Sequence, residues 1–165
     1  MALELISMKS SKPEHELIES LWVLERNSGI CLFEENFEKD ATNGISIDLI
    51  CGFLSAISVI AVEAFEEDIK YIELSRRKLF FKNTANFVFI TSIRNQKRLN
   101  HQKVKNLMDQ ISNEFIAKFD INFESWDRNV YHFQPFSEIL KSILNGNKKS
   151  TIHNIKNGFI ELSLV

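Results

Sequence analysis

Histidines and carboxylates are the residues of this chain whose types could support acid–base or metal chemistry. The carboxylate groups Glu34-Glu35 and Glu66-Glu67-Asp68 could act as general acids or bases, but each lies near the end of an expected element with no nucleophile beside it. The histidines are scattered, and none lies at a metal-ligand spacing from a cysteine or a carboxylate. They are His15, His101, His132 and His153. We interpret these groups as surface residues and predict no catalytic residue and no metal ligand.

Sequence motifs that mark common active sites are missing. The chain has no GxGxxG or GxxxxGK[ST] loop for phosphates, no HExxH pair for zinc and no GxSxG turn for a nucleophilic serine. The sequence therefore predicts a protein that is not an enzyme and that needs no cofactor.

Composition and charge narrow the possible classes of protein. The chain has 165 residues, of which 44% are hydrophobic and 25% charged, as expected of one folded domain with a core of ordinary size. Phenylalanine occurs 14 times and tyrosine only twice, so we expect a core of apolar rings. The net charge of −2 argues against a protein that coats nucleic acid.

The cysteines and the N-terminus favour a cytoplasmic protein. Cys31 and Cys51 do not form a CxxC motif, and we expect buried, reduced thiols, although the two could form one bridge. Residues 1–11 show no secretion signal. Polar residues interrupt the longest apolar run, 45–65, which fits a buried amphipathic helix better than a membrane span.

The pattern of apolar runs and turn residues predicts an α+β fold. We expect strands at 17–26, 30–37, 69–74, 78–82 and 86–93, and helices at 46–65, 100–119 and 135–145. Short connections favour an antiparallel five-stranded sheet, with the first helix on one face and the last two on the other. Residues 1–16 form an N-terminal extension, 17–146 the domain, and 147–165 a tail or a further strand.

The helix at 46–65 is the most informative element. At 100° per residue, its apolar side chains cover about half of the circumference, including Leu49, Phe53 and Ile60, and we assign them to the core. The remaining arc is small and weakly polar. It holds Gly52, Ser55, Ala56, Val59, Val62 and Glu63. This arc is either the outer edge of a well-buried helix or a partner-binding face.

Charges are segregated along the sequence. Acidic residues dominate 34–73, whereas 75–108 contains no aspartate or glutamate. Folding can mix these charges on the surface. If the segregation survives folding, a basic rim would suit an anionic membrane or an acidic partner. Its residues would be Arg76, Arg77, Lys78, Arg94, Lys97 and Arg98.

Three stretches of the sequence have a recognisable pattern: ESLWVLERNSGICLFEENF, DLICGFLSAISVIAVEAF and YIELSRRKLFFKNTANFVFITSI. They resemble the longin domain, a profilin-like domain related to roadblock domains, in its archaeal and trafficking-regulator form. With the order of elements, the resemblance covers about 17–144.

The resemblance implies a binding module that forms homodimers or heterodimers with longin or roadblock proteins and acts in small-GTPase regulation or vesicle trafficking. It places the dimer interface on the first helix and the third strand, which adds Ile69, Tyr71 and Glu73 to the residues of the small arc. Two alternatives remain. One is a structural adaptor subunit, and the other is a small-molecule sensor with a cavity of about 300–1,000 Å³ lined by phenylalanines. A core closed by Phe53, Phe80, Phe87 and Phe115 without such a cavity would exclude the sensor.

Overall fold

A computed structural model describes residues 17–96 and 99–146 of the chain. The predicted N-terminal extension and C-terminal tail, together with Lys97 and Arg98, lie outside these ranges. The elements in order are β1 (Ile18–Glu25), β2 (Cys31–Asn36), α1 (Ile47–Phe65), β3 (Tyr71–Glu73), β4 (Arg77–Asn83), β5 (Phe87–Arg94), α2 (His101–Lys118), the 3-10 helix η2 (Val130–Phe133) and α3 (Phe136–Leu144).

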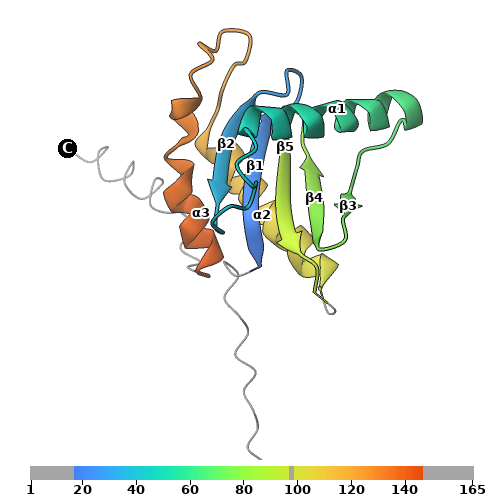
Figure 1. Ribbon diagram of the computed structural model, residues 1–165. Helices are drawn as coiled ribbons and strands as arrows, with labels where there is room; N and C mark the ends of the chain where they lie inside the picture. The colour runs from blue at the N-terminus through green and yellow to red at the C-terminus, as the bar shows by residue number, and fades with distance from the viewer. Residues whose placement is uncertain (1–16, 97–98, 147–165) are drawn as a thin grey trace, which may run out of the picture.

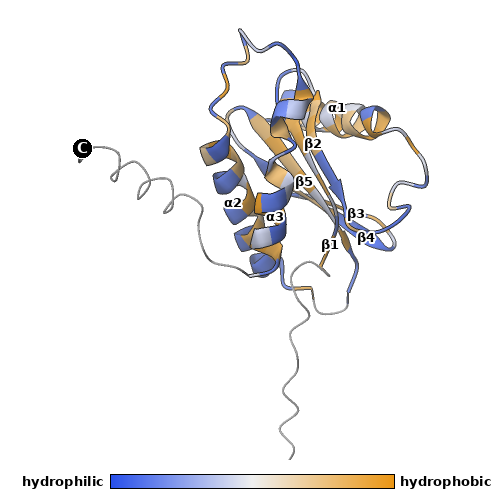
Figure 2. Cartoon of the chain, turned by 90° about the vertical axis from the view of Figure 1, so that its left-hand side faces the viewer, coloured by the Kyte–Doolittle hydropathy of each residue, from blue (hydrophilic) through white to orange (hydrophobic). Residues whose placement is uncertain are grey.

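The five strands form one antiparallel sheet in the order β2-β1-β5-β4-β3 (Figure 1). The central strands β1 and β5 pair along their length, with Trp22 opposite Ile90, and both are buried because helices cover both faces. Figure 2 shows α1 on one side of the sheet and α2 and α3 on the other. The predicted α+β class, the five-stranded antiparallel sheet and the placement of the three helices are confirmed, and this arrangement is consistent with a longin-like fold.

The two faces of the sheet are covered very differently. On the side of α2 and α3, Phe115 packs against the rings of Phe89, Phe133 and Phe136, with centroids 4.9–5.6 Å apart. On the side of α1, the buried cluster is smaller. It comprises Trp22, Leu24, Cys51, Leu54, Phe81, Val88 and Ile90. The Phe-rich core predicted from composition therefore lies on the side of α2 and α3.

The expectation that Phe53 belongs to the core is wrong. Phe87 and Phe115 do pack edge to face in the core, 5.3 Å apart, and Phe80 belongs to the same buried cluster. Phe53 instead lies on the outer side of α1 with 62% of its surface exposed. The helix turns this ring away from the sheet, so it contributes nothing to the core.

The turn between β1 and β2 fixes where α1 sits. The carboxylate of Glu25 accepts hydrogen bonds from the backbone N–H groups of Asn27 and Ser28, which closes the turn. Gly29 follows with a φ of +70°, and a Cβ at this position would lie only 2.4 Å from Oγ of Ser55 on α1. Glycine is thus needed both for the backbone conformation and for the close approach of the helix.

Substitution of Gly29 by alanine tests this contact. Gly29→Ala should lower the free energy of unfolding by about 2–4 kcal/mol, because backbone strain adds to the overlap with Ser55. Gly44→Ala is the matched control, since Gly44 has a φ of +73° but nothing within 4 Å of its added Cβ. It should lose only about 1–2 kcal/mol from strain. Equal losses in urea denaturation would contradict a role for the contact with α1.

Candidate protein-interaction surface

Helix α1 contacts the sheet through a narrow strip of its surface. Only Cys51 and Leu54 are fully buried, and Ile47, Ile50 and Ile57 pack partly buried against the same cluster. Cys31 and Cys51 are both free thiols. A hydrogen bond with Cys31, together with burial, raises the pKa of the Cys51 thiol. Because only two residues of α1 are fully buried, the interpretation of α1 as a well-buried helix is wrong.

The side of α1 opposite the sheet carries an exposed apolar stripe. Leu49, Phe53 and Ile60 are 67%, 62% and 58% exposed, and Ala56 between them is exposed as well. These four residues, here called the α1 stripe, fall within about 60° of one another at 100° per residue. The sequence assigned three of them to the core because α1 is apolar around most of its circumference. A helix lying on one sheet face buries a narrower strip.

The interface residues expected on the small arc of α1 share Ala56 with this stripe and otherwise form one flank of it. Gly52, Ala56, Val59, Val62 and Glu63 are exposed, and Ser55 is half-buried. Val59, Val62 and Glu63 also line a hollow of about 210 Å³ that reaches the β1–β2 turn and the ion pair between Arg26 and Asp68. The structure therefore brings these six residues together on one side of the helix, next to the α1 stripe.

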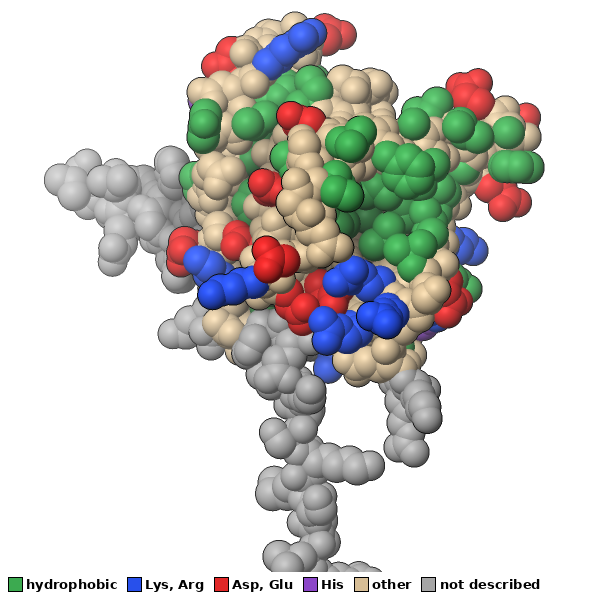
Figure 3. Space-filling model, viewed as in Figure 1, with side chains coloured by type: hydrophobic (Ala, Val, Ile, Leu, Met, Phe, Trp, Pro, Cys, Tyr) green, Lys and Arg blue, Asp and Glu red, His purple; other side chains and the backbone are tan. Residues whose placement is uncertain are grey.

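The β3 residues expected at the same interface do not all face it. Ile69 and Ile72 pack into the α1-side cluster. Tyr71 instead contacts the ring of His101 on α2, with centroids 5.4 Å apart, and Glu73 pairs with Lys78 on that same side. Successive side chains of a strand point to opposite faces, so Ile72, with Leu79 of β4, belongs with α1. Figure 3 shows apolar side chains gathered over the sheet beneath α1.

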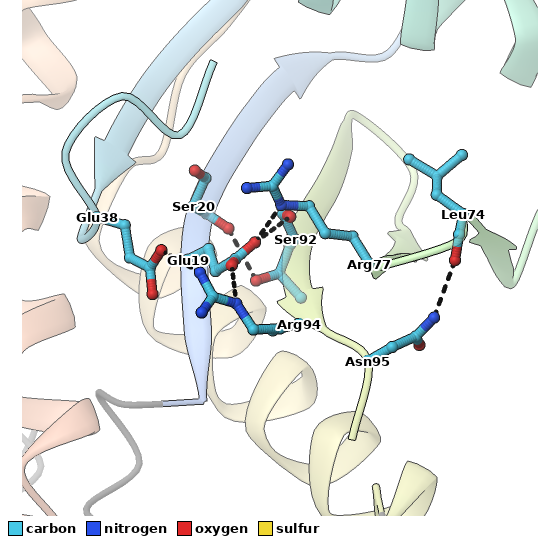
Figure 4. A network of polar contacts seen from close by, with 9 residues as sticks. Glu19, Ser20, Glu38, Leu74, Arg77, Ser92, Arg94 and Asn95 are labelled. Atoms are coloured by element: carbon cyan, nitrogen blue, oxygen red, sulfur yellow. Dashed lines mark hydrogen bonds and ion pairs between the residues drawn. The ribbon is translucent and has the colours of Figure 1, made fainter. Parts of the chain in front are cut away.

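A charged network borders this apolar area at the end of the sheet away from α1 (Figure 4). Glu19 is only 3% exposed, and its carboxylate lies 2.5 Å from Nε of Arg77 and 3.0 Å from Nε of Arg94. The Ser92 hydroxyl also donates to Glu19, and Arg94 pairs with Glu38 at 2.7 Å. These contacts join residues more than 50 positions apart, so no local sequence signal reveals them.

This network mixes positive and negative charge on the predicted basic rim. Arg77 and Arg94 are matched by Glu19 and Glu38, and Lys78 lies 3.6 Å from Glu73. Arg76 is exposed. Within residues 17–96 and 99–146 the rim is thus interleaved with carboxylates.

Two further findings bear on the kind of site. By length and composition alone α1 could cross a membrane, but in this fold it lies against the sheet through Cys51 and Leu54. Among the described residues, no group of three His, Cys, Asp or Glu side chains could hold a metal ion. In this fold, the exposed face of α1 is a surface of the folded domain, and apolar patches on such surfaces are typical of interaction sites.

The Glu19 network makes a prediction about stability and pH. Burial raises the pKa of Glu19, but hydrogen bonds and charge from Arg77 and Arg94 outweigh it and hold the pKa below its usual value. The stabilisation is therefore present above the ordinary glutamate pKa and is lost as pH falls through the lowered folded-state value.

Glu19→Gln should lower the free energy of unfolding at pH 7 by about 1–3 kcal/mol, because two arginines lose a buried carboxylate. The exposed Glu38→Gln is the control and should cost less than about 1 kcal/mol. The difference between wild type and Glu19→Gln in urea denaturation should shrink in acid. A difference that grew as pH fell would contradict this assignment.

Comparison with known proteins gives a likeness of structure only. No protein-family model matches the chain, and no curated protein matches it. Among solved structures, MglB of Myxococcus xanthus is similar with a TM-score of 0.43 and 16% identity, over 61% of this chain and 85% of that one. The mammalian SRP receptor is similar with a TM-score of 0.46 and 11% identity, over 82% of this chain and 98% of that one. At these values neither likeness supports an inference about function, which rests on the surface of this chain.

Proposed function

We propose that this chain is a non-enzymatic protein-interaction module of longin type. Its α1 stripe packs against a second copy of the chain or a related longin or roadblock protein, and the assembled module recruits or regulates a small Ras-like GTPase. One observation carries the first half, namely the exposure of Leu49, Phe53 and Ile60 along one line of α1. The second half, binding of a small GTPase, rests on the resemblance to longin domains alone.

The charges around α1 favour a protein partner over an anionic membrane. The helix contains no lysine or arginine, and exposed acidic residues lie on it and directly after it. They are Asp48, Glu63, Glu66, Glu67 and Asp68. Helices that lie on a membrane surface carry lysine and arginine on their polar face, and anionic lipid would repel this one.

Small residues beside the stripe allow another helix to approach closely. A Cβ built at Gly52 meets nothing within 4 Å, so the chain's own packing does not require glycine there. Ala56, one turn further along, is also exposed. Gly52 and Ala56 therefore leave room beside the rings and aliphatic chains of the stripe, where ridges of a partner helix would fit.

Charge placed in the α1 stripe should separate the subunits. Phe53→Glu and Ile60→Glu each bury an unpaired carboxylate in the proposed interface and should convert a dimer to a monomer, as measured by size-exclusion chromatography with light scattering. Val59→Glu, on the flank, should act more weakly. Ile116→Glu is the control, since Ile116 is an exposed apolar residue of α2, and it should leave the mass unchanged. A wild-type protein that is monomeric at high micromolar concentration would refute self-association. A Phe53→Glu/Ile60→Glu double variant that remains dimeric would refute self-association through the α1 stripe.

Binding of a GTPase is a separate test. A purified small Ras-like GTPase, loaded with GDP or with a non-hydrolysable GTP analogue, is titrated into the wild-type protein in a calorimeter. We expect binding that prefers one nucleotide state, because a regulator must distinguish the two. Absence of binding in both states across a panel of such GTPases would remove this half of the proposal and leave association through α1 standing.

A further inference from the structure

Strand β3 is the outer strand of the sheet, and its outer edge has unpaired backbone groups. The N–H of Phe81 donates to the carbonyl of Lys70, and the N–H of Leu74 donates to the carbonyl of Arg77. In an antiparallel ladder, bonded and non-bonded pairs alternate, so Tyr71 and Glu73 direct their N–H and C=O groups away from β4. Among the described strands none lies beyond β3. This edge is therefore a template for one more strand.

A hollow lies next to this edge on the α2 side of the sheet. Its volume is about 370 Å³. Its apolar lining comes from the side chains of Tyr71, Phe80, Val104 and Met108, while Phe81 turns its ring to the α1 side. The rings of Tyr71 and Phe80 both pack against His101, with centroids 5.4 and 5.3 Å away, and this fixes one wall. The hollow has room for a large apolar side chain from outside.

Positive charge surrounds the hollow. Lys70, Lys82 and Lys105 all line it, and Asp109 is the carboxylate among the lining residues. Asp109 lies 2.8 Å from Nζ of Lys82, so that pair is neutral. Lys70 and Lys105 are exposed and make no ion pair within the part of the chain that the structure describes. Two uncompensated positive charges therefore flank an apolar hollow beside an open strand edge.

We propose that this corner binds an extended acidic segment of a partner protein. The segment adds a short strand to the outer edge of β3 through the backbone of Tyr71 and Glu73. One of its large apolar side chains enters the hollow, and its carboxylates face Lys70 and Lys105. The site is independent of the proposed function, because the hollow and the α1 stripe lie on opposite faces of the sheet.

The open strand edge distinguishes this partner from other acidic ligands. A small organic acid could use the lysines and the hollow, but it would leave the N–H and C=O groups of Tyr71 and Glu73 unpaired. A second copy of this chain pairing through its own β3 would use the edge, but it would offer no free apolar side chain to the hollow, since its Tyr71 packs on its own His101 and its Ile72 packs against the α1-side cluster. An acidic extended segment satisfies the edge, the hollow and the charge together.

The probe is a fluorescein-labelled nonapeptide with a central tryptophan between two valines and six flanking glutamates. Fluorescence anisotropy measures its binding to the full chain. We expect saturable binding that weakens with added salt, because solvent-exposed charges are screened. The double variant Lys70→Glu/Lys105→Glu should bind at least about tenfold more weakly. The matched variant Lys39→Glu/Lys118→Glu changes the charge equally at exposed lysines away from the hollow, and it should bind like the wild type.

Peptide controls separate the possible modes of binding. A peptide with proline in place of both valines lacks two backbone donors and should not bind. A peptide with lysine in place of the glutamates should not bind either, because its positive charge is repelled by Lys70 and Lys105. On addition of the original peptide, the amide NMR signals of Tyr71 and Glu73 should shift. The proposal is overturned if the proline peptide binds equally, as a small acid would, or if the Lys70→Glu/Lys105→Glu variant keeps wild-type affinity. If these NMR signals shift with protein concentration and not with added peptide, a second copy of the chain pairs with the edge, and the proposal is also overturned.

The same measurement on Phe53→Glu keeps the two proposals apart. This variant alters the α1 stripe and should bind the acidic peptide with wild-type affinity. Loss of self-association with retained peptide binding supports both proposals, whereas peptide binding that disappears with self-association overturns the independence of the corner at β3.

Discussion

The structure depends on the unequal cover that helices give to the two faces of one sheet. A sheet that is apolar on both sides must be shielded on both. The side of α2 and α3 achieves this with interlocking phenylalanines such as Phe115 and Phe136, whose centroids are 4.9 Å apart. On the other side α1 buries only Cys51 and Leu54 completely. The helix thus shields the sheet with one strip and leaves an equally apolar strip in contact with solvent.

Two local contacts keep α1 in this position, and neither involves the exposed stripe. The turn at Gly29 meets Ser55, and the half-buried Ile47, Ile50 and Ile57 fill the cluster above Trp22 and Phe81. Residues of the stripe therefore contribute little to holding the helix on its own sheet. Because their apolar surface is not needed for folding, its exposure favours a role in association.

Much of the fold could be predicted from the sequence, because its signals are local. The turn at Gly29 and the apolar runs around it define the hairpin, and the capping residue Asn100, whose side chain accepts a hydrogen bond from the Lys103 N–H, defines the start of α2. The orientation of α1 could not be predicted in the same way. A helix that is apolar around most of its circumference has no polar side to indicate which residues face solvent, so Leu49 and Phe53 were assigned to the core.

The same limitation applies to the parts of the site that depend on distant residues. Strand β3 has three residues, too few for alternation to show that Tyr71 faces α2 while Ile72 faces α1. The two arginines that pair with Glu19 lie 58 and 75 positions away in the sequence. A segment that is purely basic in the sequence therefore lies on a surface of mixed positive and negative charge in the fold.

The opposite charges of the two surfaces raise the question of why the chain would not bind itself head to tail. Acidic residues follow α1, and lysines surround the hollow beside β3, so copies could in principle assemble without closing into a ring. The length of β3 opposes this, since three residues offer only the groups of Tyr71 and Glu73 for pairing. A short edge strand resists pairing with another whole sheet, whereas one extended segment needs only these few backbone groups, and the Glu73 carboxylate is already paired with Lys78. The acidic residues after α1 include Asp68, which Arg26 already pairs within the chain. An incoming acidic segment must therefore be flexible enough to reach both the edge and the hollow, and this requirement favours an extended peptide over the folded α1 end of another copy.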